Sequence, residues 1–139
     1  MKEPLRRKAR KAALTILYIH DLMGFPLDEV VKQVLEKIKL NEKNLEYLDK
    51  LISQIKEHKK KIDRTIKKYL INWDFQRLSY IDRAILRIAT CELLYFEDIP
   101  PKVSIDEAIE LAKEFSDDDA RRFINGVLDA IYKNLDIKK

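Results

Sequence analysis

Apolar residues recur at intervals of three and four along almost the whole chain, and this period constrains the fold more than any other feature. In the segment 5–23, the residues Leu5, Ala9, Ala12, Ala13, Ile16 and Leu17 recur at this spacing. This spacing places them on one face of a helix. The 139 residues include only 2 glycines and 4 prolines, too few turn residues for an all-β fold. The sequence therefore predicts an all-α fold.

We expect six to seven helices in two small sub-bundles. Five helices are predicted at about residues 5–23, 27–38, 42–70, 105–115 and 118–135, and another begins at Ser79. The helix that begins at Ser79 is apolar on more than one side, which predicts a central position in the bundle. The expected N-terminal subdomain spans residues 1–71 and the C-terminal one 72–139, with a hinge over 72–78. The wholly polar stretch 57–61 predicts a kink in the longest helix.

Several helix ends can be predicted from local sequence. The expected caps are Pro4 at the first helix, Asn41, Ser79, and Asp117 or Asp118. Ser104 and Glu107 form a capping-box pattern that predicts a helix start at Ile105. Asn125-Gly126 is a hairpin signal, but the helical period continues across it. We therefore expect Gly126 inside the last helix, where another backbone would approach closely.

Catalytic and metal-binding signals are weak. The single cysteine, Cys91, cannot form a disulfide within the chain or a thiolate zinc site, and a buried hydrophobic role is expected. His20 and His58 lie on different predicted helices, and there is no nucleophile motif or phosphate-binding glycine loop. The sequence predicts a protein that is not an enzyme and holds no cofactor or metal.

Targeting signals are also weak. No stretch approaches the roughly 18 apolar residues of a membrane span, and the basic start has no secretory pattern. An Arg-rich mitochondrial transit peptide is the less favoured interpretation of that start, because the segment has few serines. We expect a cytoplasmic protein.

Charge is concentrated in three blocks. Residues 1–11 hold six cations against Glu3, residues 56–68 hold seven cations against two acids, and residues 105–119 hold seven acids against Lys113. In the first block, cations crowd a helix N-terminus, which the helix dipole disfavours. The sequence therefore predicts solvent-exposed cations that bind a polyanion, with solubility as the alternative. For residues 56–68 a solvated helix face is favoured, and whether they contact RNA stays open. In the acidic block 105–119, the acids that are not explained by a position at a helix start could contact a basic protein partner.

The chain resembles the NusB family of transcription antitermination factors. The resemblance covers nearly the whole chain and is carried by three segments: Arg6 to Tyr18 (RRKARKAALTILY), Ile81 to Ala89 (IDRAILRIA) with Glu92-Leu93, and Pro101 to Lys113 (PKVSIDEAIELAK) with Phe123 to Asp129 (FINGVLD) after it. It implies an all-helical fold of two subdomains without catalysis. It also implies binding to boxA, a short single-stranded RNA element of ribosomal leader transcripts, with the small-subunit ribosomal protein NusE as partner. The assembly would act on RNA polymerase as an antitermination complex.

The resemblance also implies site residues. The RNA-binding residues would be Arg6, Arg7, Lys8, Arg10, Lys11, Tyr18, Arg122 and Phe123. Lys8 stands where the family often has arginine, so it keeps the charge but loses planar stacking. The protein-partner residues would be Asp82, Arg87, Asp118 and Asp119. Two alternatives to an antitermination factor remain, an RNA-targeting helical module and a helical protein adaptor. The base sequence read, the extent of the partner surface and self-association stay open.

Overall fold

A computed structural model describes residues 5–135 of the chain as six α-helices and one short 3-10 helix, with no strand among these residues. The elements are α1 (Arg7–Met23), α2 (Leu27–Lys37), α3 (Glu42–Lys68), η1 (Phe75–Arg77), α4 (Tyr80–Tyr95), α5 (Pro101–Phe115) and α6 (Asp118–Asn134). The predicted all-α fold is confirmed. Within these residues, no helix is both long and apolar enough to cross a membrane.

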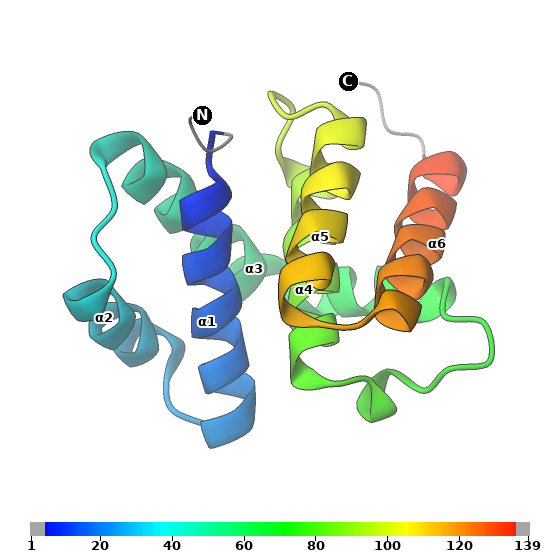
Figure 1. The fold of residues 1–139 in the computed structure, drawn as a ribbon, viewed down its shortest axis with the longest axis horizontal. Coiled ribbons are helices and arrows are strands. Elements are labelled where there is room, and N and C mark those ends of the chain that lie inside the picture. The colour runs from blue at the N-terminus through cyan, green and yellow to red at the C-terminus, as the bar shows by residue number, and fades with distance from the viewer. Residues whose placement is uncertain (1–4, 136–139) are drawn as a thin grey trace.

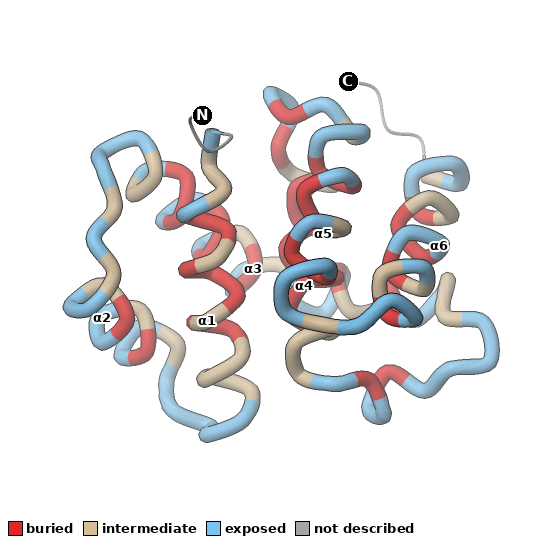
Figure 2. The backbone as a smooth tube through the Cα atoms, in the orientation of Figure 1, coloured by how far each residue is buried: buried red, intermediate tan, exposed pale blue. Residues whose placement is uncertain are grey.

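The helices form two groups that meet at α4. Helices α1 and α2 lie on one side and α5 and α6 on the other, while α3 crosses behind them (Figure 1). Helix α4 contacts α1, α3, α5 and α6, and every residue from Ala84 to Leu93 is buried (Figure 2). The predicted central position of this helix is confirmed, and the apolar surface buried around it stabilises the fold.

Three of the expected caps are present. The side chains of Asn41, Ser79 and Asp117 accept hydrogen bonds from the backbone N–H groups of residues 44, 82 and 120. Each satisfies an N–H group that a helix start leaves unpaired. Pro4 lies outside the described residues.

The predicted capping box of Ser104 and Glu107 is wrong. Helix α5 begins earlier, at Pro101, whose fixed φ and missing N–H suit the first position of a helix. Both side chains of the supposed box are instead buried, and they serve contacts with other helices.

The sequence predicted a kink in α3 and a close backbone approach at Gly126, and only the kink is present. Helix α3 is kinked at His58, where φ is −114° and ψ is 22°, as the polar stretch indicated. Gly126 lies inside α6, which confirms the helical interpretation. However, a Cβ built on Gly126 would meet nothing within 4 Å, so the expected close backbone approach is wrong.

Candidate nucleic-acid interface

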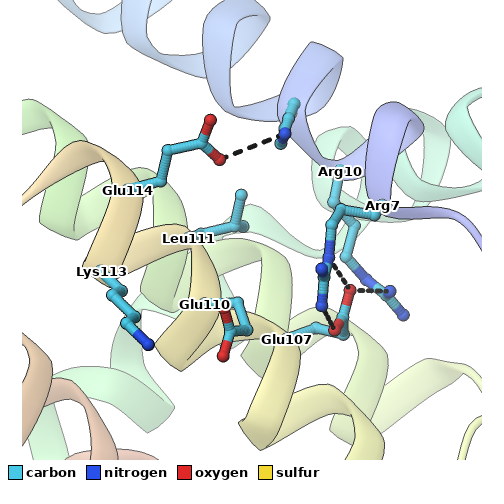
Figure 3. Close-up of a pocket in the computed structure, with 8 residues that line it drawn as sticks. Arg7, Arg10, Glu107, Glu110, Leu111, Lys113 and Glu114 are labelled. Atoms are coloured by element: carbon cyan, nitrogen blue, oxygen red, sulfur yellow. Dashed lines mark hydrogen bonds and ion pairs between the residues drawn. The ribbon is translucent and has the colours of Figure 1, made fainter. Parts of the chain in front are cut away.

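The basic start of α1 lies against acidic side chains from the α4–α5 region. Arg6 adopts a left-handed backbone (φ 71°) before the helix, and its Nη2 donates to Asp98 Oδ2 at 2.8 Å. Arg7 donates from Nε and Nη2 to both carboxylate oxygens of Glu107, at 3.1 and 2.6 Å. One turn later, Lys11 Nζ lies 3.2 Å from Glu114 Oε2. Figure 3 shows Arg7 and Glu107 meeting across the space between α1 and α5, with Glu114 pointing toward α1.

Arg10 lies deepest in this network. Its side chain is buried and donates from Nε and Nη2 to Glu92 at 2.8 and 3.0 Å, while Nη1 lies 3.3 Å from Glu107. Glu92 also accepts hydrogen bonds from the hydroxyls of Tyr47 and Ser104. A buried charge needs such paired and hydrogen-bonded surroundings to be tolerated. Helices α1, α3, α4 and α5 therefore meet at one buried ion pair.

The pKa values reflect this coupling. Burial alone would lower the pKa of Arg10, but the hydrogen bonds and charge of Glu92 outweigh it and raise that pKa above its ordinary value. Burial, reinforced by the charge of Glu92, raises the pKa of Tyr47 well above 10. At neutral pH, Arg10 is therefore charged and Tyr47 is a neutral hydrogen-bond donor.

The structure corrects the expectation that the α1 cations stand in water awaiting a polyanion. Carboxylates of the chain itself lie against Arg6, Arg7, Arg10 and Lys11, and they offset the unfavourable helix-dipole interaction. Arg10 is an interior residue, and its expected place on an outer face is wrong. Lys8 does lie on the exposed face, and no carboxylate of residues 5–135 pairs with it.

A polar cleft runs along these pairs. It has a volume of about 260 Å³, and its lining residues are Arg7, Arg10, Lys11, Glu107, Glu110, Leu111, Lys113 and Glu114. Cations on α1 form one wall, and the α5 wall is mainly acidic (Figure 3). A phosphate that approached the α1 wall would therefore exchange places with a carboxylate rather than fill an unpaired site.

The other expected RNA contacts lie away from the start of α1. Tyr18 is half-buried and meets the ring of Tyr80 edge-on, with centroids 6.4 Å apart. Arg122 is exposed and Phe123 half-buried in the first turns of α6. The starts of α1 and α6 lie at opposite ends of the molecule, with α5 between the two helices (Figure 1). An RNA that contacts only one end of the molecule therefore cannot reach all the residues that were expected to bind RNA.

The expected partner residues are divided too. Arg87 is buried, with its guanidinium bonded to Asp63 at 2.9 and 3.1 Å and to Asp21 at 2.5 Å. Its expected place on a partner surface is wrong, because it is an internal link between α4, α3 and α1. Asp82 accepts a hydrogen bond from Ser116 at 2.9 Å and is half-buried.

The two remaining acids are on the surface. Asp118 and Asp119 are exposed at the start of α6, and Asp118 pairs with Arg121 at 3.1 Å within the helix. They are accessible to a basic partner. Among residues 5–135, no group of three or more His, Cys, Asp and Glu side chains could hold a metal ion.

Three residues in or near these sites were not predicted from the sequence. Glu92 and Asp98 were not recognised as partners of the arginines, and exposed Trp73 was not singled out. A charged residue at the centre of an apolar helix requires a counter-charge, so Glu92 itself carried a usable signal. Trp73 carried none, because its exposure depends on how the loop after α3 is placed.

Comparison with known proteins agrees with this architecture. The family model described as the NusB family matches residues 7–133. The transcription antitermination protein NusB of Dehalococcoides mccartyi is 42% identical over 130 residues, which cover 94% of this chain and 91% of that protein.

Solved structures give the same result. T. maritima NusB is 40% identical with a TM-score of 0.87, and the match covers 96% of this chain and 94% of that one. A crystal structure of the antitermination factors NusB and NusE in complex with double-stranded RNA matches at 35% identity and a TM-score of 0.87, covering 94% of this chain and 97% of that one. The chain belongs to the NusB family.

Proposed function

We propose that this chain is a transcription antitermination factor that binds a boxA-type single-stranded RNA element together with the ribosomal protein NusE. The observation that carries the proposal is the similarity, over 94% of this chain, to a NusB that was crystallised with NusE and double-stranded RNA. The complex would act on RNA polymerase in the cytoplasm, and the chain would contribute binding surfaces rather than catalysis.

We assign the cations of α1 to two different roles. Lys8 is exposed, while Arg6, Arg7 and Lys11 are only partly covered, so these four side chains can reach RNA phosphates. Arg10 instead positions α1 against α4 and α5 through Glu92. Because the chain's own carboxylates compete for most of these cations, RNA affinity at this face alone should be modest and strongly salt-dependent.

The remaining residues extend the surface toward α6. We assign Tyr18, Arg122 and Phe123 to RNA, since arginine and aromatic side chains stack on unpaired bases. We assign exposed Asp118 and Asp119, together with half-buried Asp82, to the protein partner. Because one modest surface discriminates poorly between RNAs, NusE is expected to complete the binding site.

The test is a filter-binding titration of a boxA-type RNA and a scrambled RNA, each with and without NusE. We expect NusE to tighten boxA binding, and boxA to tighten NusE binding by the same factor. Lys8→Gln should weaken boxA binding, whereas Lys37→Gln, an exposed lysine on α2, should not. Equal affinity for both RNAs in the presence of NusE would favour a helical protein adaptor instead.

A further inference from the structure

The second half of α3 carries a row of solvent-exposed cations, as the start of α1 was expected to do. Beyond the kink at His58, the exposed basic residues are Lys59, Lys60, Lys61, Arg64, Lys67 and Lys68. Among the described residues, no carboxylate lies within ion-pair distance of any of them. This is the reverse of α1, where carboxylates lie beside most of the cations.

The acids of this segment are already engaged. Asp63 accepts two hydrogen bonds from buried Arg87, and Glu57 lies 3.8 Å from His58. The positive charge of the surface is therefore not offset locally. Lys60, Arg64 and Lys67 follow at intervals of four and three residues, so they share one face of the helix, and Lys68 lies beside them. Like charges at this spacing slightly destabilise a helix, so stability does not explain the pattern.

After the cationic face, the chain reaches Trp73, an exposed residue that pairs with half-buried Phe123. Trp73, five residues after Lys68, is 57% exposed. Its ring lies 5.3 Å from that of Phe123 on α6, at an angle of 53°. Arg122, the neighbour of Phe123, is also exposed. An exposed tryptophan loses hydrophobic stabilisation in the free protein, and this loss would be recovered if a base stacked on the ring.

We propose that Lys60, Arg64, Lys67, Lys68 and Trp73, which we call the α3 surface, bind single-stranded RNA that flanks the boxA-type element. The cations would contact successive phosphates, and Trp73 with Phe123 would stack an unpaired base. This combination of a basic track with an aromatic platform binds single strands with little sequence preference. A duplex keeps its bases stacked inside, so it fits this surface less well. The inference rests on the proposed function for how RNA reaches the protein.

Trp73 supplies its own reporter, because it is the single tryptophan of the chain. The probes are a boxA-type RNA alone, the same RNA with an unpaired tract of about ten nucleotides at one end or the other, and the same RNA with a duplex extension. We expect the single-stranded extension on at least one end to tighten binding and quench Trp73 fluorescence. Equal quenching by the duplex extension, or no gain from either single-stranded extension, would overturn the proposal.

A matched pair of triple variants separates this surface from net charge. Lys60→Gln/Arg64→Gln/Lys67→Gln removes three cations of the α3 surface, and Lys32→Gln/Lys37→Gln/Lys39→Gln removes three exposed lysines in and just after α2. For the extended RNA, the first variant should lower the magnitude of the slope of log affinity against log salt by about 2. This value corresponds to three lost phosphate contacts at about 0.7 each. The α2 variant should keep the slope. Equal effects of the two variants would overturn the proposal.

The unextended RNA keeps the two proposals distinguishable. The α3 variant should bind it as the wild type does, since only the flanking contacts are removed. If the wild type bound boxA no better than a scrambled RNA, the proposed function would fail. A gain from the extension that the α3 variant lost would still support this surface.

Discussion

Replacing Glu92 with glutamine should cost about 3 kcal/mol of the free energy of unfolding, because it removes one charge from the buried network. In the native protein the Glu92 carboxylate accepts two hydrogen bonds from Arg10, at 2.8 and 3.0 Å, and others from Tyr47 and Ser104. A glutamine amide has one acceptor oxygen, and its NH2 group faces other donors. Arg10 would then be a buried cation with an incomplete set of partners.

The magnitude follows from what remains beside Arg10. Removing one partner of a buried ion pair typically costs about 3–5 kcal/mol. Here Glu107 stays 3.3 Å from Arg10 and keeps one carboxylate nearby, so the lower end of that range applies. For a chain of this size, this loss corresponds to a fall of roughly 10 °C in Tm.

Urea unfolding followed by far-ultraviolet circular dichroism measures this loss, and the m value should not change. Glu110→Gln, at an exposed position on α5, is the control and should stay within about 0.5 kcal/mol of the wild type. Arg10→Met/Glu92→Met removes both charges and should be less destabilised than Glu92→Gln. A loss below about 1 kcal/mol for Glu92→Gln would refute the reasoning that Arg10 depends on this carboxylate.

Three further outcomes are expected. Burial, followed by the charge of Glu92, raises the pKa of the Cys91 thiol, so a thiol reagent at about pH 8 should label the native protein far more slowly than the urea-unfolded chain. Burial also raises the pKa of Tyr47 above its unfolded value of 10, so the free energy of unfolding should fall as pH rises through 10, which urea titrations from about pH 9 to about pH 11 can measure. Glu114→Gln removes the carboxylate 3.2 Å from Lys11 and should raise boxA affinity about twofold to fivefold in the filter-binding titration, whereas a fall in affinity would contradict the exchange of partners in the cleft.

Local signals predicted much of the fold. The period of apolar residues located every α-helix, and the caps at Asn41, Ser79 and Asp117 act within three residues of their own positions. The capping-box pattern at Ser104 failed because two tertiary interactions outweighed it. Ser104 donates to Glu92, and Glu107 accepts from Arg7 and Arg10.

The electrostatics of the site could not be predicted in the same way. The basic block at the start of α1 was visible in sequence, but the carboxylates that neutralise it lie 82 to 103 residues away along the chain. No local pattern pairs residues at that separation. The same limit applies to Arg87, which the sequence placed on the right helix, while its interior position depends on Asp21 and Asp63 in other helices.

The salt dependence of boxA binding tests most directly whether RNA lies across the partly covered start of α1. The measurement compares the wild type with Arg7→Gln/Lys8→Gln/Lys11→Gln in the presence of NusE, and it leaves Arg10 in place to preserve the buried network. We predict weaker binding and a slope of log affinity against log salt that is smaller by about 2, from three lost phosphate contacts at about 0.7 each. An unchanged affinity and slope in a variant with wild-type helicity would contradict the account.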